Sequence, residues 1–298
     1  MGKANTRLGK GLALGEGLLY LAPSLLIFAV FIFYPMFKSL RLSLYQTDLV
    51  GMERAYVGFR HYVDIFVKGN FGHDLKVTLV FTLMTVAGSL VISLALAYIA
   101  NWQLKGIGVF RVIFATPLVI AVASASMIWL MLFNPSSGML NFILAKLHLP
   151  SVRWLPDPNW ALVSVSIVAV WRSIGFNTIV LLSGLQAIPG QLYESARIDG
   201  AGPFRLFKDI TLPMLSPTLF FVLIVSIINA LQAFGEINIL TQGGPAGATN
   251  VIVFSIYREA FFNFNYSYAS AEAILLFLII MVLTLFQFWV LERRVFYK

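Results

Sequence analysis

Two apolar stretches of the chain are interrupted by side chains that can form hydrogen bonds and ion pairs. The first reads VWRSIGFN (170–177) and the second reads SIINALQAFGE (226–236). Polar groups at membrane depth are costly, and those that occur commonly face a cavity or one another. We therefore take eight residues of these stretches as candidates for lining an internal cavity: Trp171, Arg172, Gly175, Asn177, Ser226, Asn229, Gln232 and Glu236.

The same side chains also allow a purely structural interpretation. Arg172 could pair with Glu236 or extend to the membrane surface, and Asn229 could join two helices by a hydrogen bond. The sequence leaves both interpretations open.

Catalysis and metal binding are not expected of this chain. Carboxylates and histidines do not cluster at membrane depth, so we expect no catalytic residue and no metal site. The three histidines, His61, His73 and His148, lie outside the longest apolar runs and are expected to be solvated loop residues. The absence of cysteine excludes disulfides and thiolate chemistry.

The composition predicts an all-α polytopic membrane protein. Of the 298 residues, 59% are hydrophobic and 11% are charged, whereas a soluble domain carries about a quarter charged residues. A membrane helix needs about 20 apolar residues. Six runs can supply them: Leu18–Phe37, Val77–Ala100, Val109–Phe133, Ala161–Ser183, Ser216–Leu240 and Glu272–Leu291. Pro23, Pro35 and Pro117 lie inside these runs and are expected to kink their helices.

Basic residues at both ends of the chain set its expected orientation. They are Lys3, Arg7 and Lys10 before the first run and Arg293, Arg294 and Lys298 after the last. Six spans put both termini on one side, and the excess of Lys and Arg predicts that this side is cytosolic. The net charge of +8 is therefore attributed to contact with membrane lipid, and we expect no nucleic acid partner.

This orientation places three long loops outside the cell membrane, at Lys38–Lys76, Asn134–Trp160 and Thr241–Ala271. Long external loops of a compact membrane protein often form a docking surface. The chain lacks a Walker-type P-loop, so we expect no nucleotide site within it.

A polar segment, ESARIDGAGPFRLFKDITLP (194–213), separates the fourth and fifth apolar runs and carries six charged residues. Pro189 is expected to close the fourth membrane helix, and residues 191–198 can form a short helix. The glycines of Gly200-Ala201-Gly202 then break it, and Pro203 suits the first turn of a second short helix, 203–210. These residues predict a bent cytosolic elbow. Physical reasoning alone leaves two partners for it, the lipid surface or a cytosolic protein.

The same segment resembles the EAA loop of binding-protein-dependent ABC importer permeases. The family pattern is matched at Glu194, Ala196, Asp199, Gly200, Ala201, Ile210, Leu212 and Pro213. It departs at Ser195, where one small residue replaces another. The stretches LFNPSSGMLN, TQGGPAGATNVIVFSIYREAF and YASAEAILLFLIIMVLTLFQFWVLERRVFYK extend the resemblance to the sugar and sn-glycerol-3-phosphate branch of the family.

The resemblance implies a type I permease fold with six transmembrane helices and a set of partners. These are a second homologous permease, two ABC ATPase subunits and an extracytoplasmic solute-binding protein. It implies no cofactor in this chain, because ATP and Mg²⁺ belong to the ATPases. The implied coupling residues are Glu194, Ala196, Asp199, Gly200, Ala201, Gly202, Pro203 and Phe207. Among them, Glu194 is expected to pair with a basic residue of an ATPase, Asp199 to cap or orient the elbow, and Gly200 and Gly202 to allow the bend.

The resemblance also implies that the cavity candidates line a sugar path, with Trp171 stacking on a sugar face and Asn and Gln bonding hydroxyls. Asparagines that contact sugar in relatives align here with Ala230 and Ala233, so this part of the pattern is absent. Arg172 would suit a phosphate-bearing solute by charge.

The expected organisation is therefore a cytosolic tail (1–17), a permease domain (18–291) containing the coupling loop (189–213), and a second cytosolic tail (292–298). The alternatives are a secondary active transporter, which would not explain the elbow, and a membrane enzyme or receptor.

Overall fold

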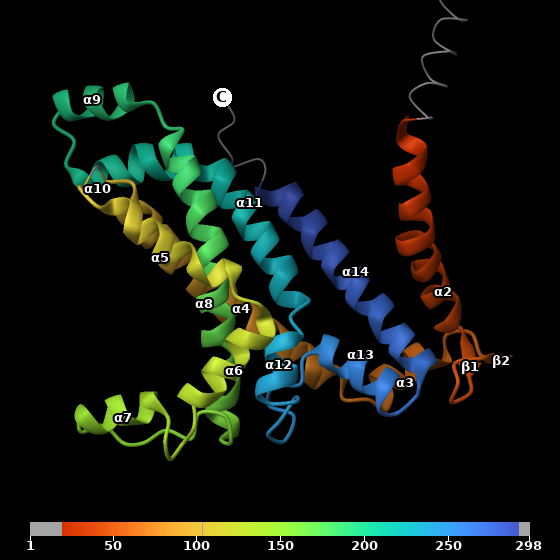
Figure 1. Ribbon diagram of the computed structural model, residues 1–298. Helices are drawn as coiled ribbons and strands as arrows, with labels where there is room; N and C mark the ends of the chain where they lie inside the picture. The colour runs from red at the N-terminus through yellow and green to blue at the C-terminus, as the bar shows by residue number, and fades with distance from the viewer. Residues whose placement is uncertain (1–19, 103, 292–298) are drawn as a thin grey trace, which may run out of the picture. The chain divides into compact units, whose positions relative to one another are not determined.

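The computed structural model describes residues 20–102 and 104–291, and most of them form helices (Figure 1). Five helical segments are long and apolar enough to cross a membrane, at Tyr20–Leu42, Phe71–Ala100, Pro158–Gln186, Pro203–Leu240 and Tyr266–Trp289. A sixth crossing results if the bent pair Ile107–Val119 and Val122–Leu132 is one span. The structure thus confirms the prediction of an all-α membrane fold. The basic residues that set the predicted orientation of the termini lie outside the described residues.

The chain divides into two compact units, which are described separately. The described part of the first contains residues 20–67 and 259–274. It begins with a helix that passes through a π-helical turn, η1 (Ala29–Phe33), into α2 (Tyr34–Leu42). A short hairpin follows, made of β1 (Tyr45–Thr47) and β2 (Glu53–Tyr56), and then α3 (Arg60–Val67).

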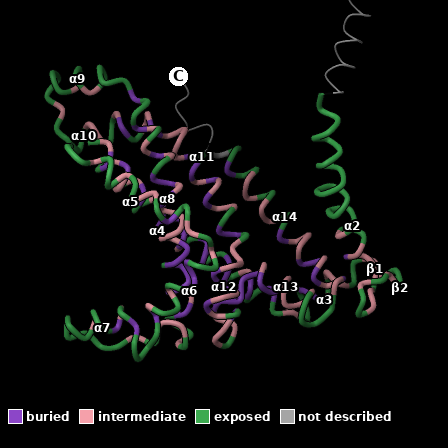
Figure 2. The backbone as a smooth tube through the Cα atoms, viewed as in Figure 1, coloured by how far each residue is buried: buried purple, intermediate pink, exposed green. Residues whose placement is uncertain are grey.

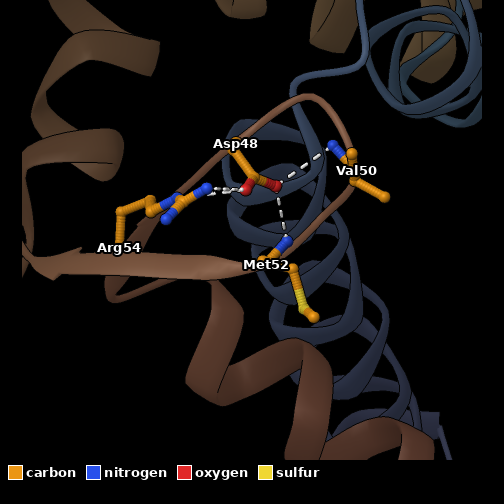
Figure 3. Close-up of polar contacts among 4 residues, drawn as sticks. All are labelled: Asp48, Val50, Met52 and Arg54. Atoms are coloured by element: carbon orange, nitrogen blue, oxygen red, sulfur yellow. Dashed lines mark hydrogen bonds and ion pairs between the residues drawn. The ribbon is translucent and has the colours of Figure 1, made fainter.

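Asp48 organises the turn of the β1–β2 hairpin (Figure 3). Its carboxylate accepts hydrogen bonds from the backbone N–H groups of Val50 and Met52, at 3.1 and 2.8 Å, and pairs with Arg54 at 2.7 Å. The hydrogen bonds from the Met52 and Val50 backbone, with the Arg54 guanidinium, lower the pKa of Asp48 from its ordinary value. The ionised carboxylate therefore stabilises this turn.

The second unit contains residues 68–102, 104–258 and 275–291. Its elements are α4 (Phe71–Ala100), α5 (Ile107–Val119), α6 (Val122–Leu132), α7 (Met139–Lys146), α8 (Pro158–Gln186), α9 (Gly190–Ile198), α10 (Pro203–Leu206), η2 (Phe207–Thr211), α11 (Leu212–Leu231), α12 (Gly235–Leu240), most of α13 (Ile252–Phe261) and the second half of α14 (Tyr266–Leu291). Capping residues fix several boundaries. Asp157 accepts the N–H of Asn159 at the start of α8, and Arg111 donates to the last carbonyl of α4, Ala100, at 2.8 Å.

Two apolar cores form where α4, α8 and α11–α12 pack together, in the region coloured as buried in Figure 2. The first core is built around Phe81, Val165 and Ile237, and the second around Ala97, Leu181 and Leu215. Between the two cores these helices carry buried polar residues, among them Thr85, Asn177 and Ser226. This layering leaves the middle of the helices for the candidate site.

Several predicted boundaries were wrong, because polar residues at the helix ends hid the first turns. The second span starts at Phe71 rather than Val77, so His73 and Asp74 lie in α4 instead of an outer loop. The sixth starts at Tyr266 rather than Glu272. The fourth ends at Gln186, and Pro189 caps α9 instead of closing α8.

The histidines are held more specifically than expected. Nε2 of His61, in α3, lies 3.1 Å from the carbonyl oxygen of Tyr45, and Nε2 of His73 lies 3.1 Å from the carbonyl oxygen of Gly247. The prediction of loop positions was wrong for these two, because both sit in helices and reach neighbouring loops, although His73 is exposed to solvent as predicted. His148 lies exposed in the turn after α7, as predicted. Within the described residues, no three metal-ligating side chains come together.

Candidate functional site

A cavity of about 640 Å³ lies between the two apolar cores of the second unit. It forms where two helices are interrupted. Helices α5 and α6 meet at a bend of 102°, after Pro117, and the helix of the candidate span Pro203–Leu240 breaks between α11 and α12 at 232–234. Gly235, at the second break, packs so closely on Val122, just after the first, that a Cβ would have no room. The span predicted at Ser216–Leu240 lies within the candidate span Pro203–Leu240, and the structure adds that its helix is interrupted at 232–234.

The predicted polar residues converge on this cavity. Six of the eight candidates line it: Arg172, Asn177, Ser226, Asn229, Gln232 and Glu236. They come from α8, from the last turns of α11, from the break and from α12. Ala230 and Ala233, where the family resemblance implied sugar-contacting asparagines, also line the wall.

Arg172 and Glu236 form an ion pair in the wall of the cavity. The Glu236 side chain is 6% exposed and the Arg172 side chain 28%. They are the two charged residues among the described residues of the lining, so the cavity carries no net charge. Of the alternatives that the sequence left open for Arg172, the structure supports pairing with Glu236.

Asn177 forms a second polar contact that joins three helices. Its side-chain nitrogen donates to Ser89 of α4 at 3.4 Å and to Ser226 of α11 at 3.3 Å. All three side chains are buried. The long distances indicate weak bonds, so the amide can exchange partners at a small cost in free energy.

Two candidates lie outside the cavity lining. Trp171 packs edge-on against Trp129 of α6, with ring centroids 5.9 Å apart. Gly175 faces α5, where a Cβ would come 2.8 Å from the backbone nitrogen of Leu118. The structure thus gives both residues a packing role and does not bear out their predicted place in a solute path.

Helix α4 contributes a wall of the cavity that was not predicted from the sequence. Five buried hydroxyl residues follow one face of this helix at spacings of three and four: Thr78, Thr82, Thr85, Ser89 and Ser93. Thr85 lines the cavity, and its hydroxyl has no hydrogen-bond partner among the described residues. The helical spacing of these hydroxyls was the signal that could have revealed this wall.

The predicted elbow is present. Helix α9 ends at Ile198, and Gly200 takes φ +80°, a conformation that glycine adopts at little cost. Gly202 has φ −74°, which any residue can adopt, so its predicted need for glycine was wrong. From Pro203 the chain is helical without interruption to Leu231, so the second arm of the elbow continues directly into the fifth span.

Internal contacts hold the elbow in one shape. The hydroxyl groups of Tyr193 on α9 and Thr211 on η2 lie 3.0 Å apart, and Phe207 packs edge-on against Tyr98 of α4. Phe207 thus anchors the second arm to α4. Asp199 is the C-cap residue of α9. Its backbone N–H donates to the carbonyl oxygen of Ser195, and its side chain is exposed.

The outer surface of the elbow combines charge and apolar area. Glu194 is exposed and has no ion pair within the described part of the chain. Ile198 and Phe204 are 87% and 78% exposed. Exposed apolar side chains on a fixed support are typical of an interaction surface.

Residues 106–297 match the family described as "Binding-protein-dependent transport system inner membrane component". The chain belongs to this family. It is therefore a multi-pass inner membrane protein, and the expected resemblance to carbohydrate-branch ABC importer permeases is confirmed.

Individual relatives agree with this assignment. The sn-glycerol-3-phosphate transport system permease protein UgpA of Agrobacterium fabrum is 36% identical over 282 residues, covering 94% of this chain and 95% of the relative. The trehalose/maltose transport system permease protein MalF of Thermococcus litoralis is 39% identical over 236 residues, covering 79% and 80%.

The fold also matches a solved transporter. A chain of a bacterial ABC transporter involved in the import of the acidic polysaccharide alginate superposes with a TM-score of 0.83. It is 26% identical, and the match covers 96% of this chain and 99% of that one. The type I ABC importer permease fold that the sequence implied is thus confirmed.

Proposed function

We propose that this family member is the pore-forming, non-catalytic permease subunit of an ATP-driven importer, and that its cargo is a polyhydroxylated, uncharged carbohydrate. The observation that carries the proposal is the cavity between the two apolar cores, which forms at the helix breaks and is lined by Asn177, Ser226, Asn229 and Gln232. A relative named for trehalose/maltose transport supports a sugar as the solute class.

The lining favours a neutral sugar on physical grounds. Amide and hydroxyl groups exchange hydrogen bonds with sugar hydroxyls, and Phe81, Phe176 and Phe234 supply apolar faces for a sugar ring. The charge of Arg172 is already balanced by Glu236, so the cavity offers no free cation for a phosphate. This weakens the argument for a phosphorylated solute that rested on Arg172 alone.

A second candidate, sn-glycerol-3-phosphate, is favoured by the UgpA relatives. It requires Arg172 to leave Glu236 and bind the phosphate while the solute passes. Arg172 keeps a buried Nε without a partner among the described residues, which gives it a spare donor for such an exchange.

The proposed assembly follows the family. A second permease completes the pore, and two ABC ATPases that hold ATP and Mg²⁺ bind to the elbows. A binding protein delivers the solute to the opposite face; a solved alginate ABC transporter with a TM-score of 0.81 is in complex with an alginate pentasaccharide-bound periplasmic protein. In this arrangement both termini and α9 lie on the cytosolic side, and Glu194, Ala196, Asp199, Gly200, Ala201 and Pro203 form the ATPase-facing part of the elbow.

The mechanism follows from the geometry. Because α10, η2 and α11 are one continuous helical stretch from Pro203, a displacement of the elbow is transmitted along α11 to the break at 232–234. The cavity wall contributed by Ser226, Asn229 and Gln232 moves with it. ATP-driven closure of the ATPases thus changes which side of the membrane the cavity faces.

The test is solute uptake by the assembled transporter in vesicles, with radiolabelled trehalose and maltose compared with sn-glycerol-3-phosphate. ATP-dependent accumulation of a neutral sugar supports the proposal. Accumulation of sn-glycerol-3-phosphate alone replaces it with the second candidate. Uptake that persists without ATPase subunits and follows an ion gradient contradicts both, because it identifies a secondary transporter.

A further inference from the structure

We infer that α7 is an interfacial helix that lays its outward face on the lipid of the outer leaflet. Figure 1 shows α7 crossing the direction of α8, at the end of this unit opposite the α9 elbow. An interfacial helix lies in the membrane plane with its apolar face in the boundary between headgroups and acyl chains. Neither the cavity nor the elbow accounts for this helix.

The outward face of α7 is apolar over its whole length. Met139, Phe142 and Ile143 follow the spacing i, i+3, i+4 and are 60%, 61% and 44% exposed. The same face ends at Lys146, whose ammonium lies 5.6 Å from the centre of the Phe142 ring. A long basic side chain beside an apolar face can extend to the headgroups while its stem covers apolar surface.

The inward face is fixed, so the apolar face cannot turn toward the protein. Asn141 is buried; its amide nitrogen donates to the carbonyl oxygens of Pro135 and Val152, at 2.9 and 3.0 Å. Its carbonyl oxygen accepts from the Val152 backbone and from the indole N–H of Trp154, at 3.1 and 3.0 Å. Three of these bonds hold α7 to the following loop and one holds it to the preceding turn, and together they present Phe142 outward.

Two observations favour lipid over a protein partner as the occupant. First, the neighbouring helix α6, which contacts α7, is itself apolar and exposes Met127, Ile128 and Met131. Second, Met139, Phe142 and Ile143 supply no side-chain hydrogen-bonding group, whereas protein interfaces carry about one hydrogen bond per 100–200 Å².

Charge completes the argument. Lys146 is the sole charged residue between Asn134 and Val152, so this segment contains no acidic side chain. A single basic group beside an apolar face complements an anionic headgroup. Trp160, at the start of α8 and 40% exposed, adds an aromatic side chain of the kind enriched at membrane interfaces.

The chain contains no cysteine, so single cysteines for spin labelling can be introduced without first removing native cysteines. We would label Phe142→Cys and Ile143→Cys in the assembled transporter, reconstituted in vesicles of phosphatidylethanolamine and phosphatidylglycerol. Ser137→Cys is the matched control, because Ser137 is exposed in the polar turn that precedes α7. The measurement is collision of each label with molecular oxygen and with a water-soluble nickel chelate.

We expect the labels at 142 and 143 to collide with oxygen and to be shielded from nickel, and the label at 137 to show the reverse. With the label at 143, Phe142→Asp should raise nickel collision to the level of the Ser137→Cys control. Shielding from both reagents would overturn the proposal in favour of a protein contact. Full nickel access, or shielding that begins only when a solute-binding protein is added, would overturn it as well.

Discussion

Arg172 of α8 and Glu236 of α12 form an ion pair across the break that opens the fifth membrane span. The contact connects an unbroken helix to the short helix beyond the break, at the level of the cavity. The pair therefore sets both the charge of the cavity and the position of α12.

Removing one partner of the ion pair should lower the free energy of unfolding more than removing both. Glu236→Gln leaves the Arg172 guanidinium partly buried and unpaired, which is expected to destabilise the protein by about 3 kcal/mol. The double variant Arg172→Gln, Glu236→Gln replaces the ion pair by two amides and should recover most of that loss. The measurement is thermal unfolding of the purified transporter, with uptake recorded in parallel.

Uptake by the same variants separates the two candidate solutes. The double variant should still transport a neutral sugar. Its uptake of sn-glycerol-3-phosphate should fall strongly, because the Arg172 guanidinium that would bind the phosphate is gone. Equal stability of the single and double variants would show that Arg172 finds another partner and that the pair does not position α12.

The elbow and the polar wall were predictable because each depends on local chemistry. Gly200 permits the positive φ of the turn, and Pro203 suits the first turn of the helix after it. A polar residue in an apolar run, such as Asn177, faces a cavity or another polar group. The helix break at 232–234 was not predictable, since Gln232, Ala233 and Phe234 are not strong helix breakers. The interruption depends instead on the close packing of Gly235 against Val122. Tertiary packing likewise decided that Trp171 and Gly175 face neighbouring helices.

Gly200 and Gly202 provide a matched test of the elbow. Gly200→Ala forces an alanine into φ +80° and should cost about 1–2 kcal/mol in the elbow conformation. Gly202→Ala should change the free energy of the elbow conformation by only a few tenths of a kcal/mol, because the φ of Gly202 is −74° and a Cβ there meets open space. The measurement is ATPase activity stimulated by solute and binding protein in the assembled transporter.

We expect Gly200→Ala to reduce that stimulation while Gly202→Ala leaves it near the wild-type value. Equal effects of the two alanines would mean that the elbow is not held at φ +80° when the ATPase is bound. A stronger effect of Gly202→Ala would place the ATPase contact at Gly202 itself.

Charge reversal distinguishes the two arms of the elbow. Glu194 on α9 is exposed and free to meet a basic residue of an ATPase, whereas Asp209 on the second arm already lies 3.4 Å from Arg205. Glu194→Lys should abolish ATP-driven uptake, since loss of a charge-assisted bond of about 1.5–3 kcal/mol weakens ATPase binding roughly tenfold or more. The measurements are uptake and co-purification of the ATPase.

Asp209→Lys is the control, and we expect it to retain most uptake because it replaces an exposed ion pair by a like-charge pair of small effect in solvent. Membrane insertion of both variants should equal that of the wild type. If Glu194→Lys transports normally, the proposed role of Glu194 is wrong, and the apolar pair Ile198 and Phe204 becomes the main contact surface of the elbow.

The turn held by Asp48 should respond to acid. Its folded pKa is lowered by the hydrogen bonds from Met52 and Val50 and by Arg54. A lowered folded pKa means that the carboxylate stabilises the turn fully above the ordinary pKa of aspartate, and that this contribution disappears as the pH falls through the lowered value.

A spin label at Val50→Cys, where the side chain is 83% exposed, should therefore report an ordered turn at neutral pH and a more mobile one in acid. Asp48→Asn should make the label equally mobile at both pH values. A label at Phe59→Cys, outside the turn and 72% exposed, should not change over the same range. Mobility at Val50 that rises with pH instead of falling would contradict the assigned sign and the role of the ionised carboxylate.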